Sequence, residues 1–396
     1  MTMRVSLAPI HPRTQAAAAS EALLDPRGAR VVLGTHAGMN GAVVPIAPAA
    51  DTLFGPRGAC LAHRAGPLFV CDTGHHRVLA WSEAPVSDGT AADFLIGQPD
   101  FRSEGRNARG EIGPTTFNVP TGIAVAGDVL AVADAWNHRV LLWHGLPRDF
   151  NQPADVVLGQ VDFGCGSANR GQQTPRADTL HWCYGVLIHD GHLFVADSGN
   201  RRVLVWNSIP QVNGAPADLV LGQRDFATRD EGASEGIGNF GMRWPHAIAV
   251  AQDMVLVADA GSSRIVVWRR LPAQSGAACD FVLGQSSFTA FDHNRGAYYP
   301  TASTLNMPYG LAVHAGRLVV ADTANSRLLG FDIAQIGMSA AAARLAGQIG
   351  FEDKGDNRWS AAARDSLCWP YSVAPCDRTL VIADTGNNRV LLWDGA

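Results

Sequence analysis

Short apolar runs alternate with polar turns along this chain, and the same order of runs and turns returns six times. Each repeat has an apolar run that ends in Asp, a turn of four residues, and a second apolar run that opens with Arg. The Asp residues lie 62 or 63 positions apart. A fixed period of this kind predicts a repeat architecture. The pairs are Asp72 with Arg77, Asp134 with Arg139, Asp197 with Arg202, Asp259 with Arg264, Asp322 with Arg327, and Asp384 with Arg389.

The third repeat indicates which elements one unit contains. Residues 185–188 and 193–196 are apolar runs joined by Asp190-Gly191, a strong two-residue hairpin turn. A third run covers residues 202–206, and a fourth covers residues 218–221. The runs are rich in Val and Leu, and they are near-continuous, as in sheets that are buried on both faces. Four short strands per repeat predict an all-β six-bladed propeller with four antiparallel strands in each blade.

The two ends of the chain complement each other. After Asp384 only one further run follows, at residues 389–393, so the last repeat lacks its fourth strand. A matching strand is present near the N-terminus, where Ala-Arg-Val-Val-Leu-Gly at residues 29–34 resembles Ala-Asp-Val-Val-Leu-Gly at residues 154–159. We therefore expect the N-terminal strand to complete the last blade, which closes the ring and removes exposed sheet edges.

The most regular copy of the repeated turn is Asp384-Thr385-Gly386-Asn387-Asn388-Arg389-Val390. This run and its five counterparts resemble the NHL repeat, and the resemblance covers residues 29–393. It implies a six-bladed propeller but leaves the function open, because one fold hosts many functions. The expected organisation is an N-terminal extension over residues 1–28 and a single propeller over residues 29–396.

The repeated Asp and Arg are expected to be structural. An Asp before a tight turn can accept backbone N–H bonds, and the Arg that opens the next strand lies within reach of its carboxylate. A catalytic pair is needed once, whereas this pair occurs in every repeat. The Gly-Gln that follows the fourth strand in five repeats is expected to fix the start of a long loop. Function is therefore sought where the repeats differ.

The first strand of each repeat begins with a Pro-x-Gly-like motif, and this strand lines the channel of a propeller. The residue after the Pro varies, and it is aromatic in the third to sixth repeats. A Trp precedes the motif in three of these four repeats. Aromatic rings with a few polar groups are typical of binding pockets and also of packing between blades. We predict a ligand site at the channel mouth formed by Arg57, Trp182, Tyr184, Arg243, Trp244, His246, Tyr309, Trp369 and Tyr371.

Two kinds of propeller enzyme provide an alternative to binding. The NHL-like amidating lyase binds zinc through three His residues in alternate blades, each just after a Pro, which suits a catalytic zinc. Only Pro245-His246 matches, since Thr121 and Tyr371 replace the other two ligands. Lactonase-type propellers hold calcium with carboxylates, and the channel strands supply no convincing carboxylate. We predict no metal and no other cofactor. The alternative is a channel-mouth lyase or hydrolase that uses Arg57, Arg243, His246 and Tyr309.

Composition and charge limit the kinds of partner and the cellular location that we expect. The net charge is −5 and Lys354 is the only lysine, which weakens RNA binding by the basic and aromatic face, the second alternative. No apolar stretch approaches the ~20 residues of a membrane span. Pro9 and Pro12 interrupt the place of a secretory signal, and the seven Cys form no CxxC pair. These features favour reduced thiols in a cytoplasmic protein, and the abundance of Ala and Arg suggests a bacterial source.

We therefore predict a non-catalytic binding or scaffold propeller. Its loop-rich face of aromatic and Arg side chains is expected to hold a protein segment or a small ligand. No membrane partner is expected, nucleic acid is disfavoured, and a monomer is favoured.

Overall fold

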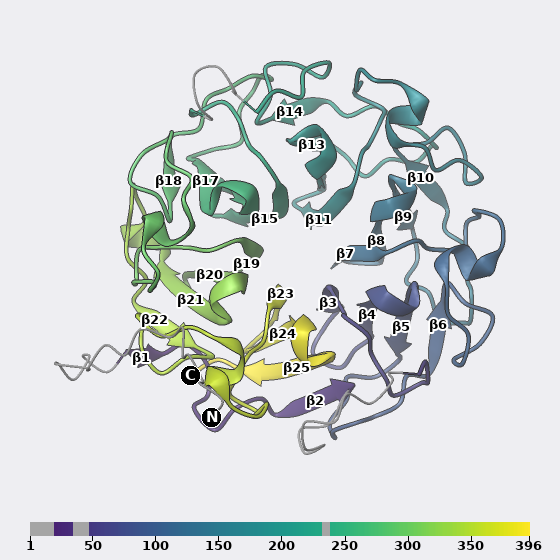
Figure 1. The fold of residues 1–396 in the computed structure, drawn as a ribbon. Coiled ribbons are helices and arrows are strands. Elements are labelled where there is room, and N and C mark those ends of the chain that lie inside the picture. The colour runs from purple at the N-terminus through teal and green to yellow at the C-terminus, as the bar shows by residue number, and fades with distance from the viewer. Residues whose placement is uncertain (1–19, 35–46, 232–237) are drawn as a thin grey trace, which may run out of the picture.

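The computed structural model describes residues 20–34, 47–231 and 238–396, in which six sheets surround a central channel (Figure 1). Each blade is a meander of antiparallel strands, and its first strand lies innermost (Figure 1). No α-helix occurs within these ranges. The first two blades contain β3 (Gly58–Leu61), β4 (Leu68–Asp72), β5 (Arg77–Trp81), β6 (Phe94–Ile96), β7 (Pro120–Ala126), β8 (Val129–Asp134), β9 (Arg139–Trp143) and β10 (Val156–Leu158). The next two contain β11 (Cys183–His189), β12 (His192–Asp197), β13 (Arg202–Trp206), β14 (Leu219–Leu221), β15 (Pro245–Ala251), β16 (Met254–Asp259), β17 (Arg264–Trp268) and β18 (Phe281–Leu283).

The N-terminal segment joins the last two blades. The sixth blade consists of β23 (Pro370–Cys376), β24 (Thr379–Asp384), β25 (Arg389–Asp394) and, as its outer strand, β2 (Val31–Gly34), which pairs antiparallel with β25. The closure predicted from the sequence is confirmed. The fifth blade consists of β19 (Pro308–His314), β20 (Arg317–Asp322), β21 (Arg327–Asp332) and β22 (Arg344–Ala346).

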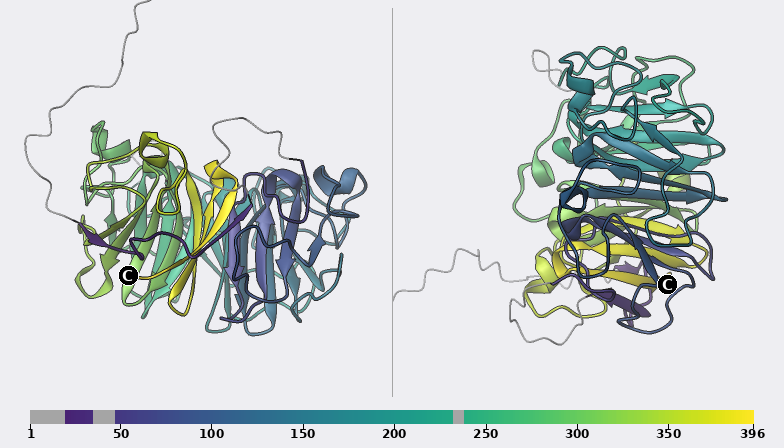
Figure 2. Two further views of the ribbon diagram at one scale, coloured as in Figure 1. Left: turned by 90° about the horizontal axis from the view of Figure 1, so that it is seen from below. Right: turned by 90° about the vertical axis from the view of Figure 1, so that its right-hand side faces the viewer.

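A two-residue strand that the sequence pattern did not indicate extends the fifth blade. This strand, β1 (Glu21–Ala22), pairs in parallel with β22. Leu23 and Leu24, which follow it, are buried against the last two blades, so ordered packing begins before residue 29. Figure 2 shows the N-terminal segment running along the outside of these two blades.

Apolar side chains fill the spaces between adjacent blades. The core forms six clusters, each drawing residues from two neighbouring blades. A Trp at the end of the third strand is buried in five blades, with Phe331 in the fifth. In the sixth blade, Trp393 Nε1 donates to the carbonyl of Asp25 at 2.8 Å, so the N-terminal segment also supplies the hydrogen-bond acceptor for this Trp.

Short 3-10 helices form the turns and part of the loops between the strands. The turn between the second and third strands of each blade contains one such helix: Thr73–His75, Ala135–Asn137, Ser198–Asn200, Ala260–Ser262, Thr323–Asn325 and Thr385–Asn387. Further 3-10 helices lie at Arg106–Arg109, Ala168–Gly171, His293–Gly296, Ile333–Gln335 and Asp356–Trp359. No helix within the described ranges is long and apolar enough to cross a membrane.

Candidate functional site

The repeated Asp and Arg form a buried hub in each blade. They face each other in register across the second and third strands, and Arg Nε donates to Asp Oδ2 at 2.7 to 3.0 Å. In the third blade, Asp197 Oδ1 accepts the backbone N–H of His181, and Arg202 donates to the carbonyls of Phe226, Arg176 and Thr179. The hub therefore ties two loop segments to the blade and leaves neither charge exposed.

The Gln after the fourth strand anchors the long loop. Gln98 Nε2 donates to the carbonyls of His75, His76 and Gly105, and the same pattern recurs at Gln160, Gln223, Gln285 and Gln348. These contacts fix the loops that lead to the channel mouth.

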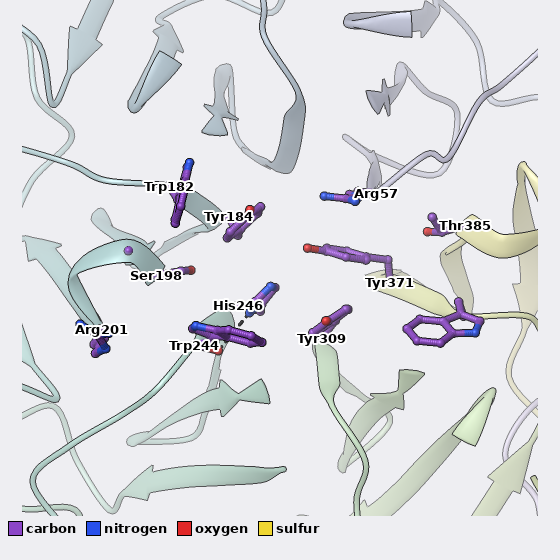
Figure 3. Close-up of a pocket in the computed structure, with 12 residues that line it drawn as sticks. Arg57, Trp182, Tyr184, Ser198, Arg201, Trp244, His246, Tyr309, Tyr371 and Thr385 are labelled. Atoms are coloured by element: carbon purple, nitrogen blue, oxygen red, sulfur yellow. Dashed lines mark hydrogen bonds between the residues drawn. The ribbon is translucent and has the colours of Figure 1, made fainter. Parts of the chain in front are cut away.

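A cavity of about 430 Å³ lies at this mouth, where the inner strands begin. It falls within the usual size range of ligand pockets. Eight of the nine residues predicted for the ligand site line it, and Figure 3 shows several of them converging from separate blades. Ligand binding by these residues stays a prediction. The eight are Arg57, Trp182, Tyr184, Trp244, His246, Tyr309, Trp369 and Tyr371.

A β-bulge turns the variable residue of the inner strand towards the channel. In the second to sixth blades, the register between the first and second strands shifts just after the Pro position. Bulges of this kind redirect a side chain out of the regular pleat. At the next position, a Cβ on Gly185 would lie 1.9 Å from the carbonyl oxygen of His246, so glycine permits the close approach of two inner strands. Thr121, which belongs to the same ring of positions, is buried and donates to the carbonyl of Tyr184 at 2.9 Å.

Four aromatic rings form a continuous wall of the cavity. The His246 ring stacks between Tyr184 and Tyr309, with centroid distances of 4.9 and 4.3 Å and interplanar angles of 6° and 14°. Tyr371 continues the series at 4.6 Å from Tyr309, and the Arg57 guanidinium carbon lies 5.0 Å from the Tyr371 ring centre. These five residues also line a second cavity of about 280 Å³ further along the channel, so they divide the channel in two.

Burial controls the protonation of this wall. Desolvation lowers the pKa of His246 to about 4, and the nearby charge of Arg57 acts in the same direction. The Nδ1 atom of His246 lies 3.0 Å from the carbonyl of Trp244, so the neutral ring carries its proton on Nδ1 and offers Nε2 as an acceptor. Burial also raises the pKa values of Tyr309 and Tyr371, which keeps both phenols protonated at neutral pH.

Three Trp side chains form the rim of the cavity. Trp182, Trp244 and Trp369 are 45%, 50% and 41% exposed, unlike the buried Trp residues between blades. Trp182 and Trp369 have left-handed backbone conformations, with φ of 49° and 51°. Their backbone N–H groups donate to His138 Nδ1 and Ser326 Oγ of the preceding blades.

The junction between the third and fourth blades departs from this arrangement. At five junctions, the last residue of the repeated turn accepts the N–H of the residue before the Pro motif; the acceptors are His76, His138, Ser263, Ser326 and Asn388. Arg201 holds this position in the third blade, and a guanidinium cannot accept a hydrogen bond. The N–H of Trp244 instead donates to Asp259 at 3.1 Å, and Trp244 lacks a positive φ. Arg201 lines the cavity and pairs with Glu231.

Arg243 is the predicted site residue that the structure places elsewhere. Its guanidinium carbon lies 4.3 Å from the ring centre of Phe291, and it does not line the cavity. Conversely, sequence analysis missed Ser198, Gly199, Arg201 and Thr385, which do line it. They belong to the repeated turn, so the regularity of that turn concealed them, although Arg201 is the only donor-only side chain at its position.

Several loop Arg residues are already paired within the chain. Arg170 and Arg176 both contact Asp178, and Arg358 pairs with Asp365 at 2.5 Å. The loop face is therefore less positive than its sequence suggests. No group of three or more His, Cys, Asp or Glu residues that suits a metal ion occurs in residues 20–34, 47–231 and 238–396.

One segment of the chain matches a known family model, and curated proteins are similar to longer parts of it. Residues 117–141 match the family model described as NHL repeat. NHL repeat-containing protein 2 of Gallus gallus is 22% identical over 358 residues, which cover 83% of this chain and 44% of that protein. The Homo sapiens protein of that name is 24% identical over 236 residues, which cover 55% and 30%. The chain thus spans less than half the length of these curated relatives.

Solved structures superpose on much of the chain. A protein of unknown function from Bacteroides thetaiotaomicron superposes with a TM-score of 0.50 at 12% identity, covering 96% of this chain and 76% of that chain. A gluconolactonase from Xanthomonas campestris gives a TM-score of 0.49 at 13% identity, covering 97% and 100%. Identities this low describe the fold and not the activity. The chain is therefore a six-bladed β-propeller that contains a match to the NHL repeat and is similar to NHL repeat-containing proteins.

Proposed function

We propose that this propeller is a binding module and that the mouth cavity holds its ligand. The observation that carries the proposal is a preformed cavity of about 430 Å³ with a wall of stacked rings and a half-exposed Trp rim. Rings that serve only to separate blades would be covered on both faces, as Trp143 and Trp268 are. The Trp rim instead retains apolar surface for a partner to cover.

A thermal-shift screen of small molecules tests this proposal. Ligands that raise the melting temperature of the wild-type protein are expected to lose their effect on the Trp244→Ala/Tyr309→Ala double variant. Trp136→Ala is the matched control, because Trp136 is 51% exposed and does not line the cavity. Ligands that stabilise the double variant as well as the wild type would show that the site lies elsewhere.

A channel-mouth lyase or hydrolase is the alternative. His246 is the only residue of the cavity wall that could act as a general base, and its low pKa makes it a weak one. Elemental analysis discriminates the two roles. Zinc or calcium that remains in stoichiometric amount after dialysis would favour the enzyme.

A cytoplasmic location is part of the proposal. All seven Cys are unpaired, and Cys60, Cys71, Cys183 and Cys279 are buried. Burial raises the pKa of Cys60 to about 12, so this thiol is unreactive.

A further inference from the structure

The mouth cavity has an unbalanced charge. Among the residues that the structure describes, Arg57 and Arg201 are the only charged side chains that line it, and no Asp or Glu does so. Arg201 is neutralised, because its Nη2 lies 2.5 Å from Glu231 Oε1. Arg57 is half-buried and has no carboxylate within 4.0 Å among the described residues. One positive charge is therefore left without an anionic partner, which is unfavourable in a partly desolvated site.

Arg57 is held in place for an incoming group. It occupies the position of the first blade that corresponds to the aromatic residues of the third to sixth blades, and it lies beside the Tyr371 ring. Its backbone N–H donates to the carbonyl of Cys71 at 3.2 Å. Figure 3 shows its side chain reaching towards the centre of the cavity, on the side opposite Trp244. A planar guanidinium in this position can bind both oxygens of a carboxylate.

The rest of the cavity suits a flat apolar body. The nearby phenols of Tyr309 and Tyr371 remain protonated, so they can donate to an anion without adding charge. The Trp182 and Trp244 rings on the other side have exposed faces that a flat ligand would cover. One unpaired positive charge matches a monoanion better than a phosphate dianion.

We propose that the cavity binds a monocarboxylate carried on an aromatic or similarly flat apolar group, with Arg57 as the carboxylate anchor and the Trp rim around the body. This inference rests on the proposed binding function, because it names the ligand class of the same cavity. Either a free small acid or the C-terminal carboxylate of a peptide ending in an aromatic residue presents this chemistry.

Isothermal titration with a matched set of probes tests the inference. Benzoate, 4-hydroxyphenylacetate and indole-3-acetate serve as acids, benzamide as the neutral analogue, and phenyl phosphate as the dianion. A tripeptide ending in Phe, with a free or an amidated C-terminus, separates the peptide source from the free acid. At least one acid or the free-carboxylate peptide is expected to bind, at least about tenfold more tightly than its neutral analogue.

Variants assign the contacts. Arg57→Met is expected to weaken acid binding by about tenfold or more, and Arg57→Lys by less, because a lysine keeps the charge but not the planar fork. Arg378→Met is the control, since Arg378 is 73% exposed and follows β23, at the end of that strand away from the cavity. Melting curves of each variant show that the fold is retained.

The outcomes separate this inference from the proposed function. If benzamide or phenyl phosphate binds as tightly as the acids, or if Arg57→Met leaves affinity unchanged, the carboxylate inference is wrong. In that case, loss of binding in Trp244→Ala/Tyr309→Ala would still support the cavity as a binding site. If no acid or peptide binds, the inference is also wrong, and the small-molecule screen decides the proposed function by itself.

Discussion

Arg201 and Arg202 are adjacent in the sequence but belong to different parts of the molecule. Arg202 is fully buried, bonds to Asp197 and to three carbonyls, and has a counterpart in all six blades. Arg201 lines the mouth cavity and pairs with Glu231. The other five blades carry His, Ser or Asn at the corresponding position. The repeated residue ties loop segments to its blade, whereas the irregular one changes the junction at the cavity. In this propeller, a residue that differs between blades can therefore lie directly beside a residue that is the same in all six blades.

The largest expected effect comes from removing the strands that close the ring. Deletion of residues 1–34 removes the buried side chains of Leu23, Leu24, Val31, Val32 and Leu33, all 5% exposed or less, and uncovers the surfaces on which they pack. At about 1.5–3 kcal/mol for each buried side chain, this loss is roughly equal to the whole stability of a typical domain. We expect cooperative thermal unfolding to disappear. Deletion of residues 1–19 is the control, and an unchanged melting temperature in the longer deletion would refute the closure mechanism.

The adjacent Arg residues give a direct test of the comparison. Arg202→Met leaves the carboxylate of Asp197 buried without its ion pair and is expected to lower the free energy of unfolding by about 3–5 kcal/mol. Arg201→Met removes a partly exposed ion pair and is expected to cost less than about 1 kcal/mol. Denaturant titration measures both. Equal losses in the two variants would contradict the distinction between hub and mouth.

A pH-dependent effect is expected at His138. Its Nδ1 accepts the N–H of Trp182, and burial lowers its pKa to about 4, with the nearby His181 as a further cause. The unfolded state therefore takes up the proton more readily, so stability is lost as the pH falls from about 6.5 towards about 4. Asn388 accepts the equivalent bond in the sixth blade. His138→Asn should therefore keep the contact and remove this part of the pH dependence, which denaturant titrations at several pH values would detect.

A loss smaller than that of the Arg202 variant is expected at a hydrogen bond between blades. Thr323 is buried, and its hydroxyl donates to the carbonyl of Pro370 at 2.7 Å. Thr323→Val keeps the shape and is expected to cost about 1–2 kcal/mol, because the carbonyl loses its partner. Thr90→Val is the control at a partly exposed site, where the hydroxyl donates to the carbonyl of Ser87. Ala135 and Ala260 occupy this position in two other blades, so the bond is not needed at every junction. A loss above about 4 kcal/mol in the Thr323 variant would show that the bond contributes more to stability than we infer.

The sequence predicted the fold well because the period and the strand pattern are repeated six times. The closing strand at residues 31–34 was predictable because it keeps the register of the other fourth strands. The strand β1 was not, since two residues carry no alternation that could be recognised. This strand forms because it pairs with the outer edge of β22, which is far away in the sequence.

The cavity was predictable in part because the Pro motif fixes one ring of positions. The aromatic residues next to that motif do line the cavity, but Arg243 packs on Phe291 instead. Side-chain direction changes from one residue to the next, and sequence position alone does not give it. Arg201 was missed for another reason, since the same turn supplies both the hub and part of the cavity lining.

The pairing of β2 with β25 has a consequence for synthesis on the ribosome. Residues 31–34 leave the ribosome long before residues 389–394, so the first strand must wait for its partner while the other blades form. At about 5–20 residues per second, the delay lasts for tens of seconds. Throughout that time the apolar strand has no partner in the nascent chain, and a slowly translating ribosome would prolong its exposure to chaperones or to other nascent chains.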